Sequence, residues 1–264
     1  MPGDPIATID WRASAKLSAA RGDDEFLVRE RFADEAPYVA VVVDRRPSMG
    51  LYPDWSPWLK KPEAVRAATE TIVASAIAAR GAVGYLDCLD EPFWISPRAR
   101  SPLELIEERA RLSRFDADAG SLRRGIEYLA RSASSLGAGS FVFVLSDFLE
   151  PPPHELWLVG TARRWELVPV VIQDPVWEQS FPATGPVVVP IADPRDGAVL
   201  EVRLRRSEAR AERERRERAR SELLTMLASL GLDPVLLHRS EPDPVQRAFL
   251  EWAERRKRAL WLRR

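Results

Sequence analysis

Residues 38–44 read Tyr-Val-Ala-Val-Val-Val-Asp, an apolar run rich in valine that ends in an acid. Such a run is typical of a strand buried on both faces, as strands are in a parallel sheet. Residues 141–145, Phe-Val-Phe-Val-Leu, have the same character and are followed by Ser146 and Asp147. The two runs predict neighbouring central strands of an open sheet, each with an acid at its carboxyl end.

Helices and strands alternate outward from these two runs. The further predicted strands cover residues 82–86, 93–95, 167–172 and 235–237. The predicted helices cover residues 62–80, 101–113, 121–133, 151–164, 207–230 and 243–259. This alternation favours right-handed βαβ units. We therefore expect an α/β fold with a central, mainly parallel sheet flanked by helices.

A Pro-rich stretch at about 173–206 interrupts this alternation. Within it, residues 187–189 and 200–204 predict a β-hairpin insertion. Residues 1–36 are polar and mixed in character, with Trp11 and residues 26–28 as apolar anchors. We expect an amino-terminal segment, 1–36, that packs on one domain, 37–264, which carries the insertion.

The composition argues against several classes of function. The chain has 264 residues, and its 39 basic and 40 acidic residues give a formal net charge of −1. No global field therefore draws it to nucleic acid or to an anionic membrane. The single cysteine, Cys88, cannot form an internal disulfide, which fits a cytoplasmic location. Two histidines, His154 and His238, are little material for a zinc site.

The sequence also bears on membrane contact. No apolar run is long enough to span a bilayer, and no signal peptide precedes the first charged residues. The basic residues 255–258, followed by Trp261 and Leu262, leave peripheral membrane contact open. A solvated helix end, with its cations near the negative end of the helix dipole, is the more common explanation of such a tail.

The two strand-end acids suggest a site. Ligands of open α/β sheets bind beyond the carboxyl ends of the strands, so neighbouring strands would bring Asp44 and Asp147 together. With the hydroxyl of Ser48 they form an oxygen-rich set that suits Mg²⁺ or Mn²⁺. The alternative is that each acid only caps the loop or helix that follows it. Spacing alone leaves both interpretations open.

Several motifs together resemble those of one family. They are Gly3-Asp4-Pro5, Ile9-Asp10-Trp11-Arg12-Ala13-Ser14-Ala15, Val28-Arg29-Glu30, the stretch from Asp44 to Met49, Ser146-Asp147-Phe148 and Asp174-Pro175. In order and spacing they are similar to the domain-of-unknown-function 58 (DUF58) family over nearly the whole chain. The resemblance implies a Rossmann-like, von Willebrand factor A-like core with a metal-ion-dependent adhesion site. It also implies a MoxR-type AAA+ ATPase as the protein partner.

The match to that metal site is partial. Asp44, Ser48 and Asp147 match ligand positions, whereas Arg46 stands where the family has its first serine. Ser121 lies near the position of the usual threonine. Arg46 is a permanent cation, and at an effective dielectric constant of roughly 20 it would repel a nearby Mg²⁺ strongly.

Arg46 therefore decides what the site holds. We expect a degenerate metal site with no bound cofactor, either filled by an ion pair between Arg46 and an acid or left empty. The alternative is that Arg46 points into solvent and leaves a working Mg²⁺ or Mn²⁺ site.

These observations favour a non-enzymatic adaptor that binds a protein partner. Trp55 and Trp58 lie in the Pro-rich loop after Asp44, where they are candidates for a binding hot spot. They fit a cover over the sheet edge equally well. The rival hypothesis is a metal-dependent phosphohydrolase that uses Asp44 and Asp147. Haloacid dehalogenase-like enzymes carry a second Asp two residues after the nucleophile, and Arg46 at that position argues against this reaction.

Overall fold

The computed structural model describes residues 37–50, 58–99, 102–111, 114–182, 187–192 and 198–261. By its contacts the chain divides after Ala36, and residues 37–264 form the second unit. All described residues belong to the second unit, so the prediction that segment 1–36 packs on the domain lies outside them.

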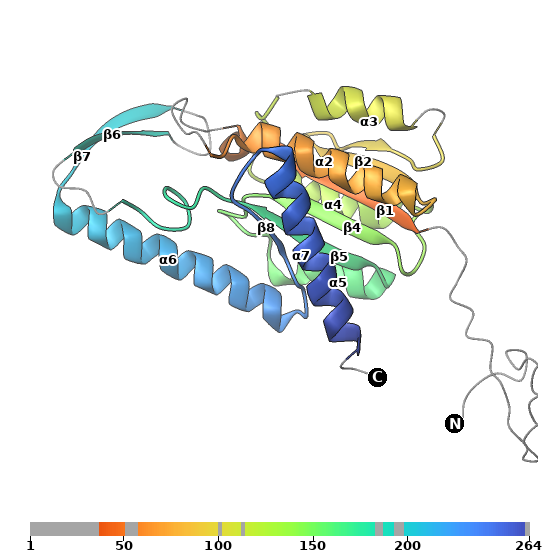
Figure 1. The fold of residues 1–264 in the computed structure, drawn as a ribbon. Coiled ribbons are helices and arrows are strands. Elements are labelled where there is room, and N and C mark those ends of the chain that lie inside the picture. Colours follow the sequence, from red (N-terminus) through yellow and green to blue (C-terminus); the bar gives the residue numbers. More distant parts are fainter. Residues whose placement is uncertain are drawn as a thin grey trace, which may run out of the picture. The chain divides into compact units, whose positions relative to one another are not determined.

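A six-stranded sheet forms the centre of the second unit (Figure 1). Its strands, in spatial order, are β3 (Phe93–Ile95), β2 (Ala82–Cys88), β1 (Tyr38–Asp44), β4 (Phe141–Ser146), β5 (Glu166–Ile172) and β8 (Val235–Leu237). Every neighbouring pair is parallel except β2 and β3. The predicted pairing of the two apolar runs is confirmed, because β1 lies beside β4 with Val39 facing Phe141.

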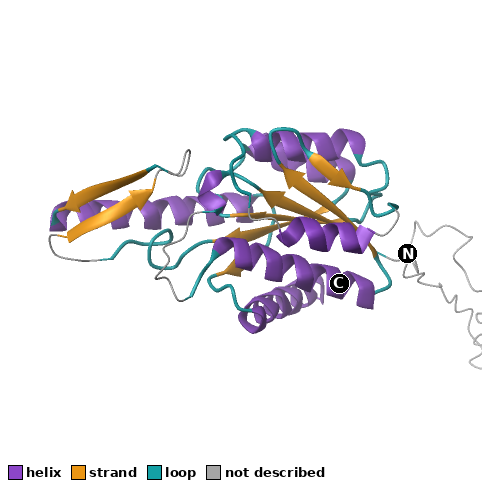
Figure 2. Cartoon of the chain, turned by 90° about the horizontal axis from the view of Figure 1, so that it is seen from above, coloured by secondary structure: helices purple, strands orange, loops and turns teal. Residues whose placement is uncertain are grey.

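Both faces of this sheet are buried, which explains the unbroken apolar runs. Alternate residues of β1 point to opposite faces: Val39, Val41 and Val43 pack in one core cluster, and Ala40 and Val42 in another. The helices that contribute to the first cluster are α2 (Lys61–Ala78), α3 (Pro102–Arg111) and α7 (Pro242–Trp261). Those that contribute to the second are α4 (Ser121–Ser132), α5 (His154–Arg163) and α6 (Arg206–Ser229). Figure 2 shows the strands between the two helix layers.

Outside the six-stranded sheet, the predicted hairpin is present and helix α5 begins later than predicted. The hairpin predicted within 173–206 is present as β6 (Val187–Ala192) and β7 (Val199–Leu204), an antiparallel pair separate from the six-stranded sheet. Helix α5 begins at His154 and not at Pro151 as predicted, because a residue that precedes a proline is disfavoured in the α conformation. Among the described helices, none is both long and apolar enough to cross a membrane.

The contact between α4 and β2 leads to a first prediction. A Cβ atom added at Gly125 of α4 would lie 2.3 Å from Sγ of Cys88. Alanine is the better helix former by about 1 kcal/mol, but overpacking costs about 1–3 kcal/mol. We expect Gly125→Ala to lower the free energy of unfolding, measured by urea denaturation. In a Cys88→Ala background, which removes Sγ, the same change should cost far less. Equal costs in both backgrounds would contradict this packing.

Candidate functional site

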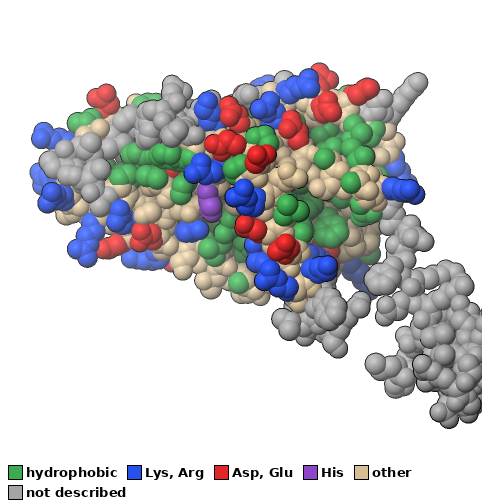
Figure 3. Space-filling model, viewed as in Figure 1, with side chains coloured by type: hydrophobic (Ala, Val, Ile, Leu, Met, Phe, Trp, Pro, Cys, Tyr) green, Lys and Arg blue, Asp and Glu red, His purple; other side chains and the backbone are tan. Residues whose placement is uncertain are grey.

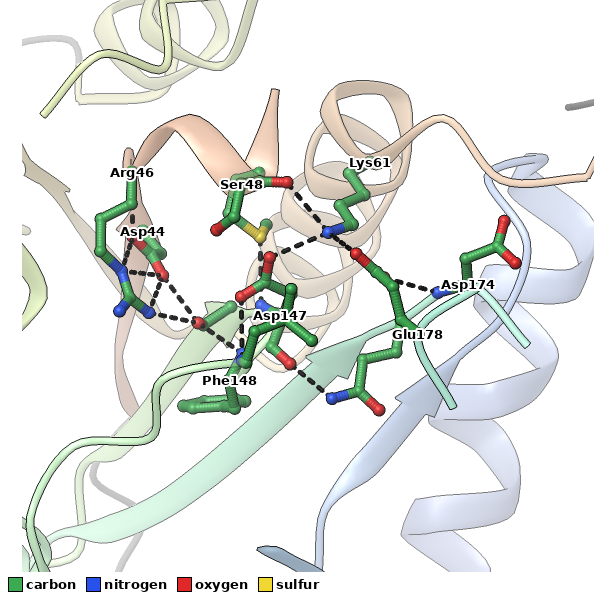
Figure 4. Close-up of polar contacts among 12 residues, drawn as sticks. Asp44, Arg46, Ser48, Lys61, Asp147, Phe148, Asp174 and Glu178 are labelled. Atoms are coloured by element: carbon green, nitrogen blue, oxygen red, sulfur yellow. Dashed lines mark hydrogen bonds and ion pairs between the residues drawn. The ribbon is translucent and has the colours of Figure 1, made fainter. Parts of the chain in front are cut away.

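The candidate site lies at the carboxyl edge of the central sheet, where β1, β4 and β5 end (Figure 4). Asp44 ends β1, Asp147 follows β4, and Asp174 follows β5. All three side chains are buried, and Asp44 and Asp147 are 0% exposed. Because a buried carboxylate is costly unless it is paired and hydrogen-bonded, each must find its partner within the protein.

Asp44 is paired with Arg46. The guanidinium Nη2 of Arg46 donates to Oδ2 of Asp44 at 2.7 Å, and its Nε lies 3.0 Å from both carboxylate oxygens. The backbone N–H of Arg46 donates to Oδ1 at 3.0 Å, and the hydroxyl of Ser146 donates to Oδ2 at 2.7 Å. Both oxygens of Asp44 are thus engaged by donors of the chain itself.

The loop after β1 directs Arg46 onto this acid. Arg46 has an extended backbone (φ −65°, ψ 153°) immediately before a short 3-10 helix, η2 (Pro47–Met49). Its side chain is buried, and Nη1 donates to the carbonyl of Glu150 at 3.1 Å. Burial would lower the pKa of Arg46, but the hydrogen bonds and charge of Asp44 outweigh it, so the pKa is raised. The guanidinium therefore remains charged in place.

Asp147 is paired with Lys61, the first residue of α2. The ammonium Nζ donates to Oδ2 of Asp147 at 2.8 Å and to the carbonyl of Ser48 at 2.9 Å. It also donates to Oε1 of Glu178, a side chain that is 14% exposed. One buried cation thus joins the loop after β1, the end of β4 and the segment after β5.

The charges of this cluster set the direction of each pKa. Burial alone would lower the pKa of Lys61, but the charges of Asp147 and Glu178 raise it. Burial raises the pKa of Asp147, and the charge and hydrogen bond of Lys61 more than reverse this, so the pKa is lowered. For Glu178, burial and the charge of Asp147 prevail over Lys61, and the pKa is raised. Lys61 therefore stabilises the ionised form of Asp147.

Trp58 is tied to this cluster through Asp174. The indole Nε1 of Trp58 donates to Oδ2 of Asp174 at 2.9 Å, and the backbone N–H of Asp174 donates to Oε2 of Glu178 at 2.8 Å. Oδ1 of Asp174 accepts the backbone N–H groups of Val176 and Trp177. The half-buried Trp58 thus fastens the segment before α2 to the segment after β5.

A second buried ion cluster lies beside the first, at the end of β2. Nε of Arg45 donates to Oδ1 of Asp87 at 2.7 Å, and Nε of Arg109 donates to Oδ2 at 2.8 Å. Nη2 of Arg45 also donates to the hydroxyl of Tyr85 at 3.0 Å. Burial, followed by the charge of Asp87, raises the pKa of Tyr85 well above its ordinary value. The acids at the ends of β2, β1 and β4 thus all meet buried cations.

The structure brings together some of the residues singled out in the sequence. Asp44 ends β1 and Asp147 follows its neighbour β4, and Ser48, which is buried in η2, helps to lower the pKa of Asp147. Ser121 is the first residue of α4, and its buried Oγ has no hydrogen-bond partner among the described residues. Trp55 lies outside the described residues.

Sequence reasoning missed the cations and acids that complete the clusters. They are Arg45, Lys61, Asp87, Arg109 and Glu178. Lys61 had one usable signal, because this Arg-rich chain contains only four lysines and Lys61 stands next to Pro62 at a helix start. The other pairings follow from the fold and carry no local pattern.

The donor set does not suit a divalent cation. Two carboxylates and a hydroxyl are oxygen ligands of the right kind, but Arg46 and Lys61 are already bonded to the two carboxylates. A metal ion there would face two positive charges in a buried setting, where repulsion is weakly screened. Within the described part of the chain, no three His, Cys, Asp or Glu residues are grouped to hold a metal.

Comparison with known proteins places the chain in a family. A family model described as "Protein of unknown function DUF58" matches residues 1–223. No curated protein matches the chain significantly. Among solved structures it is similar to an aerotolerance-related membrane protein from Bacteroides fragilis NCTC 9343, with 13% identity and a TM-score of 0.47 over 83% of this chain and 99% of that one. It is also similar to the conserved hypothetical protein BatB from Bacteroides thetaiotaomicron, with 16% identity and a TM-score of 0.46 over the same shares of the two chains.

Replacing Lys61 by methionine tests the Asp147 pair. The buried Asp147 and the partly buried Glu178 lose their shared cation, so we expect the free energy of unfolding at about pH 7 to fall by about 3–5 kcal/mol. The deficit should shrink at about pH 5, because the variant's acids can take up protons. In the native chain, the stability from Asp147 is present above its unfolded pKa of 3.8 and is lost as the pH falls through the lower folded value.

Lys60→Met is the matched control for this experiment. The Lys60 side chain is 40% exposed and lies 3.7 Å from Glu63 in a surface pair, which contributes at most about 1 kcal/mol. Urea denaturation of the native chain, Lys61→Met and Lys60→Met at both pH values measures the free energies of unfolding to be compared. Equal losses in the two variants would show that the buried ion pair is not a stabilising contact.

Arg46→Ser tests the ion pair between Arg46 and Asp44. A metal that binds only the folded state at micromolar affinity would, at millimolar concentration, stabilise it by roughly 4 kcal/mol. We expect thermal melts of the native chain to be unchanged by Mg²⁺, since Arg46 already supplies the positive charge. The variant should be less stable, because Asp44 loses its cation, and Mg²⁺ should restore part of the loss. A clear Mg²⁺-dependent rise in the native chain would show that a metal displaces Arg46.

Proposed function

This chain belongs to DUF58, a family of proteins of unknown function, and we propose that it is a non-enzymatic module that binds a protein partner. One observation carries the proposal: the two acids that chemistry at the carboxyl edge would need, Asp44 and Asp147, are buried and paired with Arg46 and Lys61. Groups held in this way support structure and leave no base or nucleophile directed at a substrate.

The geometry of Asp44 does not suit the rival reaction, metal-dependent phosphohydrolysis. A nucleophilic carboxylate must present an oxygen to phosphorus, whereas both oxygens of Asp44 accept hydrogen bonds and none of the side chain is exposed. The residue two positions later, Arg46, is a cation that cannot handle a leaving-group proton. We therefore favour binding over catalysis.

Within this proposal the core is von Willebrand factor A-like, and internal cations replace the adhesion-site metal. The family resemblance and the acid-bearing ends of β1 and β4 support that reading. Arg46 and Lys61 would then hold the loops of the carboxyl edge in one conformation, as a divalent ion does elsewhere. No cofactor is required, and the buried Cys88 fits a cytoplasmic setting.

We propose a MoxR-type AAA+ ATPase as the partner, on the strength of the family resemblance. The docking face would be the loops above Asp44 and Asp147, with Trp55 and Trp58 in one loop and the partly exposed Leu149 and Glu150 in another. On the face drawn in Figure 3, Lys and Arg are interspersed with Asp and Glu, which favours a protein partner over nucleic acid. The basic end of α7 is the region for any peripheral membrane contact.

The test is the affinity of the full chain for a purified MoxR-type ATPase of the same organism, measured by calorimetry. We expect Trp55→Ala with Trp58→Ala to weaken binding at least about tenfold, as hot-spot aromatics do. Trp58→Phe separates the roles of this residue, because it keeps an aromatic ring but removes the hydrogen bond to Asp174. Leu250→Ala, an exposed change on α7, is the control and should bind normally.

Two outcomes would overturn the proposal. Unchanged affinity in the double tryptophan variant would make the loop a structural cover only. Metal-dependent phosphatase turnover that disappears in Asp44→Asn would make the protein an enzyme.

A further inference from the structure

The β6–β7 ribbon presents an open strand edge. Among the described residues, β7 pairs with β6 alone, and the ribbon is separate from the six-stranded sheet (Figures 1 and 2). Val199 is 67% exposed and Leu200 is 68% exposed, and Glu201 and Arg203 are also exposed. An isolated two-stranded ribbon is only marginally stable, and an unpaired edge is a template for another strand.

Proline makes the β7 edge the better of the two. Residues that face each other in an antiparallel pair alternately exchange two backbone hydrogen bonds or none. Pro190 faces Glu201 and has no N–H, so this pair cannot exchange two bonds. The backbone N–H and C=O of Glu201 therefore lie at the outer edge of β7, as do those of Val199 and Arg203. The outer edge of β6 is interrupted at Pro190.

The sequence of β7 is complementary to itself. We propose that β7 pairs with β7 of a second copy of this chain, antiparallel and centred on Val202. In that register Glu201 faces the partner's Arg203, and Arg203 faces the partner's Glu201. These residues carry the outward backbone groups, so both pairs exchange two hydrogen bonds.

The side chains fit the same register on both faces of the ribbon. On one face, Leu200 lies opposite the partner's Leu204, and Val202 lies opposite its own copy, which makes one continuous apolar stripe. On the other face stand the two Glu–Arg pairs. Cross-strand apolar and opposite-charge pairs both stabilise a sheet, and the two-fold axis gives a closed dimer that does not propagate.

Charge identifies the occupant as a second copy. Across the ribbon itself, Glu201 faces Pro190 and Arg203 faces Val188, so neither charge meets an opposite charge on β6. Neither residue forms an ion pair within the described part of the chain. If one strand moved by one residue along the other, Glu201 and Arg203 would each face an uncharged residue. A shift by two residues would place Glu201 or Arg203 opposite its own copy. The contact is smaller than a standard protein interface, so we expect a weak, reversible dimer.

A charge swap tests this pairing without touching the ribbon's internal contacts. In Glu201→Arg and in Arg203→Glu, two like-charged pairs replace the two attractive ones, so we expect the dimer dissociation constant to rise at least about tenfold. An equimolar mixture of the two variants restores opposite charges at both positions and should associate as the native chain does. The double variant Glu201→Arg with Arg203→Glu should also recover.

Sedimentation equilibrium over a wide concentration range gives the association of each full-length protein, and thermal melts check that the variants remain folded. A native chain that stays monomeric at the highest concentration overturns the proposal. So does a dimer that the single swaps leave unchanged, or a mixture that fails to recover. The outcome is independent of the ATPase test, because the ribbon and the carboxyl-edge loops are different elements.

Discussion

The burial of acidic side chains at the carboxyl edge of the sheet is the constraint on which the rest of this structure depends. An ion removed from water costs several kcal/mol unless a partner compensates for it. Asp87, Asp44 and Asp147 end or follow three adjacent strands and are almost fully buried. At neutral pH these buried acids destabilise the fold unless cations or protons neutralise them. Arg45, Arg46 and Lys61 supply those cations.

The main counter-ions come from one short part of the chain. Arg45 and Arg46 directly follow β1 and turn to opposite sides, one to Asp87 and the other to Asp44. Lys61 begins α2 and reaches Asp147. The two residues after β1 and the first residue of α2 thus neutralise acids at the ends of three strands. A divalent ion bound at Asp44 and Asp147 would either displace Arg46 and Lys61 or face their positive charges in a weakly screened setting.

The strands were predictable, because a strand buried on both faces leaves a continuous apolar run, and β1 and β4 have such runs. Their adjacency followed from the alternation of helices and strands. The ion pairs were harder to predict. Lys61 is 86 residues from Asp147 and 117 residues from Glu178, and no local pattern specifies such a contact. For Arg46, the sequence allowed either solvent or an acid, and the structure shows its buried side chain paired with Asp44.

The paired charges at the carboxyl edge and the unpaired charges on β7 have different roles in this molecule. At the carboxyl edge, the charges of Arg46 and Lys61 are used in ion pairs within the protein. In the proposed function, a partner at that face would meet loops held by these pairs. On β7, Glu201 and Arg203 have no counterpart across their own ribbon. Their charge is available for recognition, and exposed pairs of this kind contribute specificity of register more than affinity. Buried charge therefore connects the loops at the carboxyl edge, and in the proposed dimer exposed charge sets the register of the ribbon.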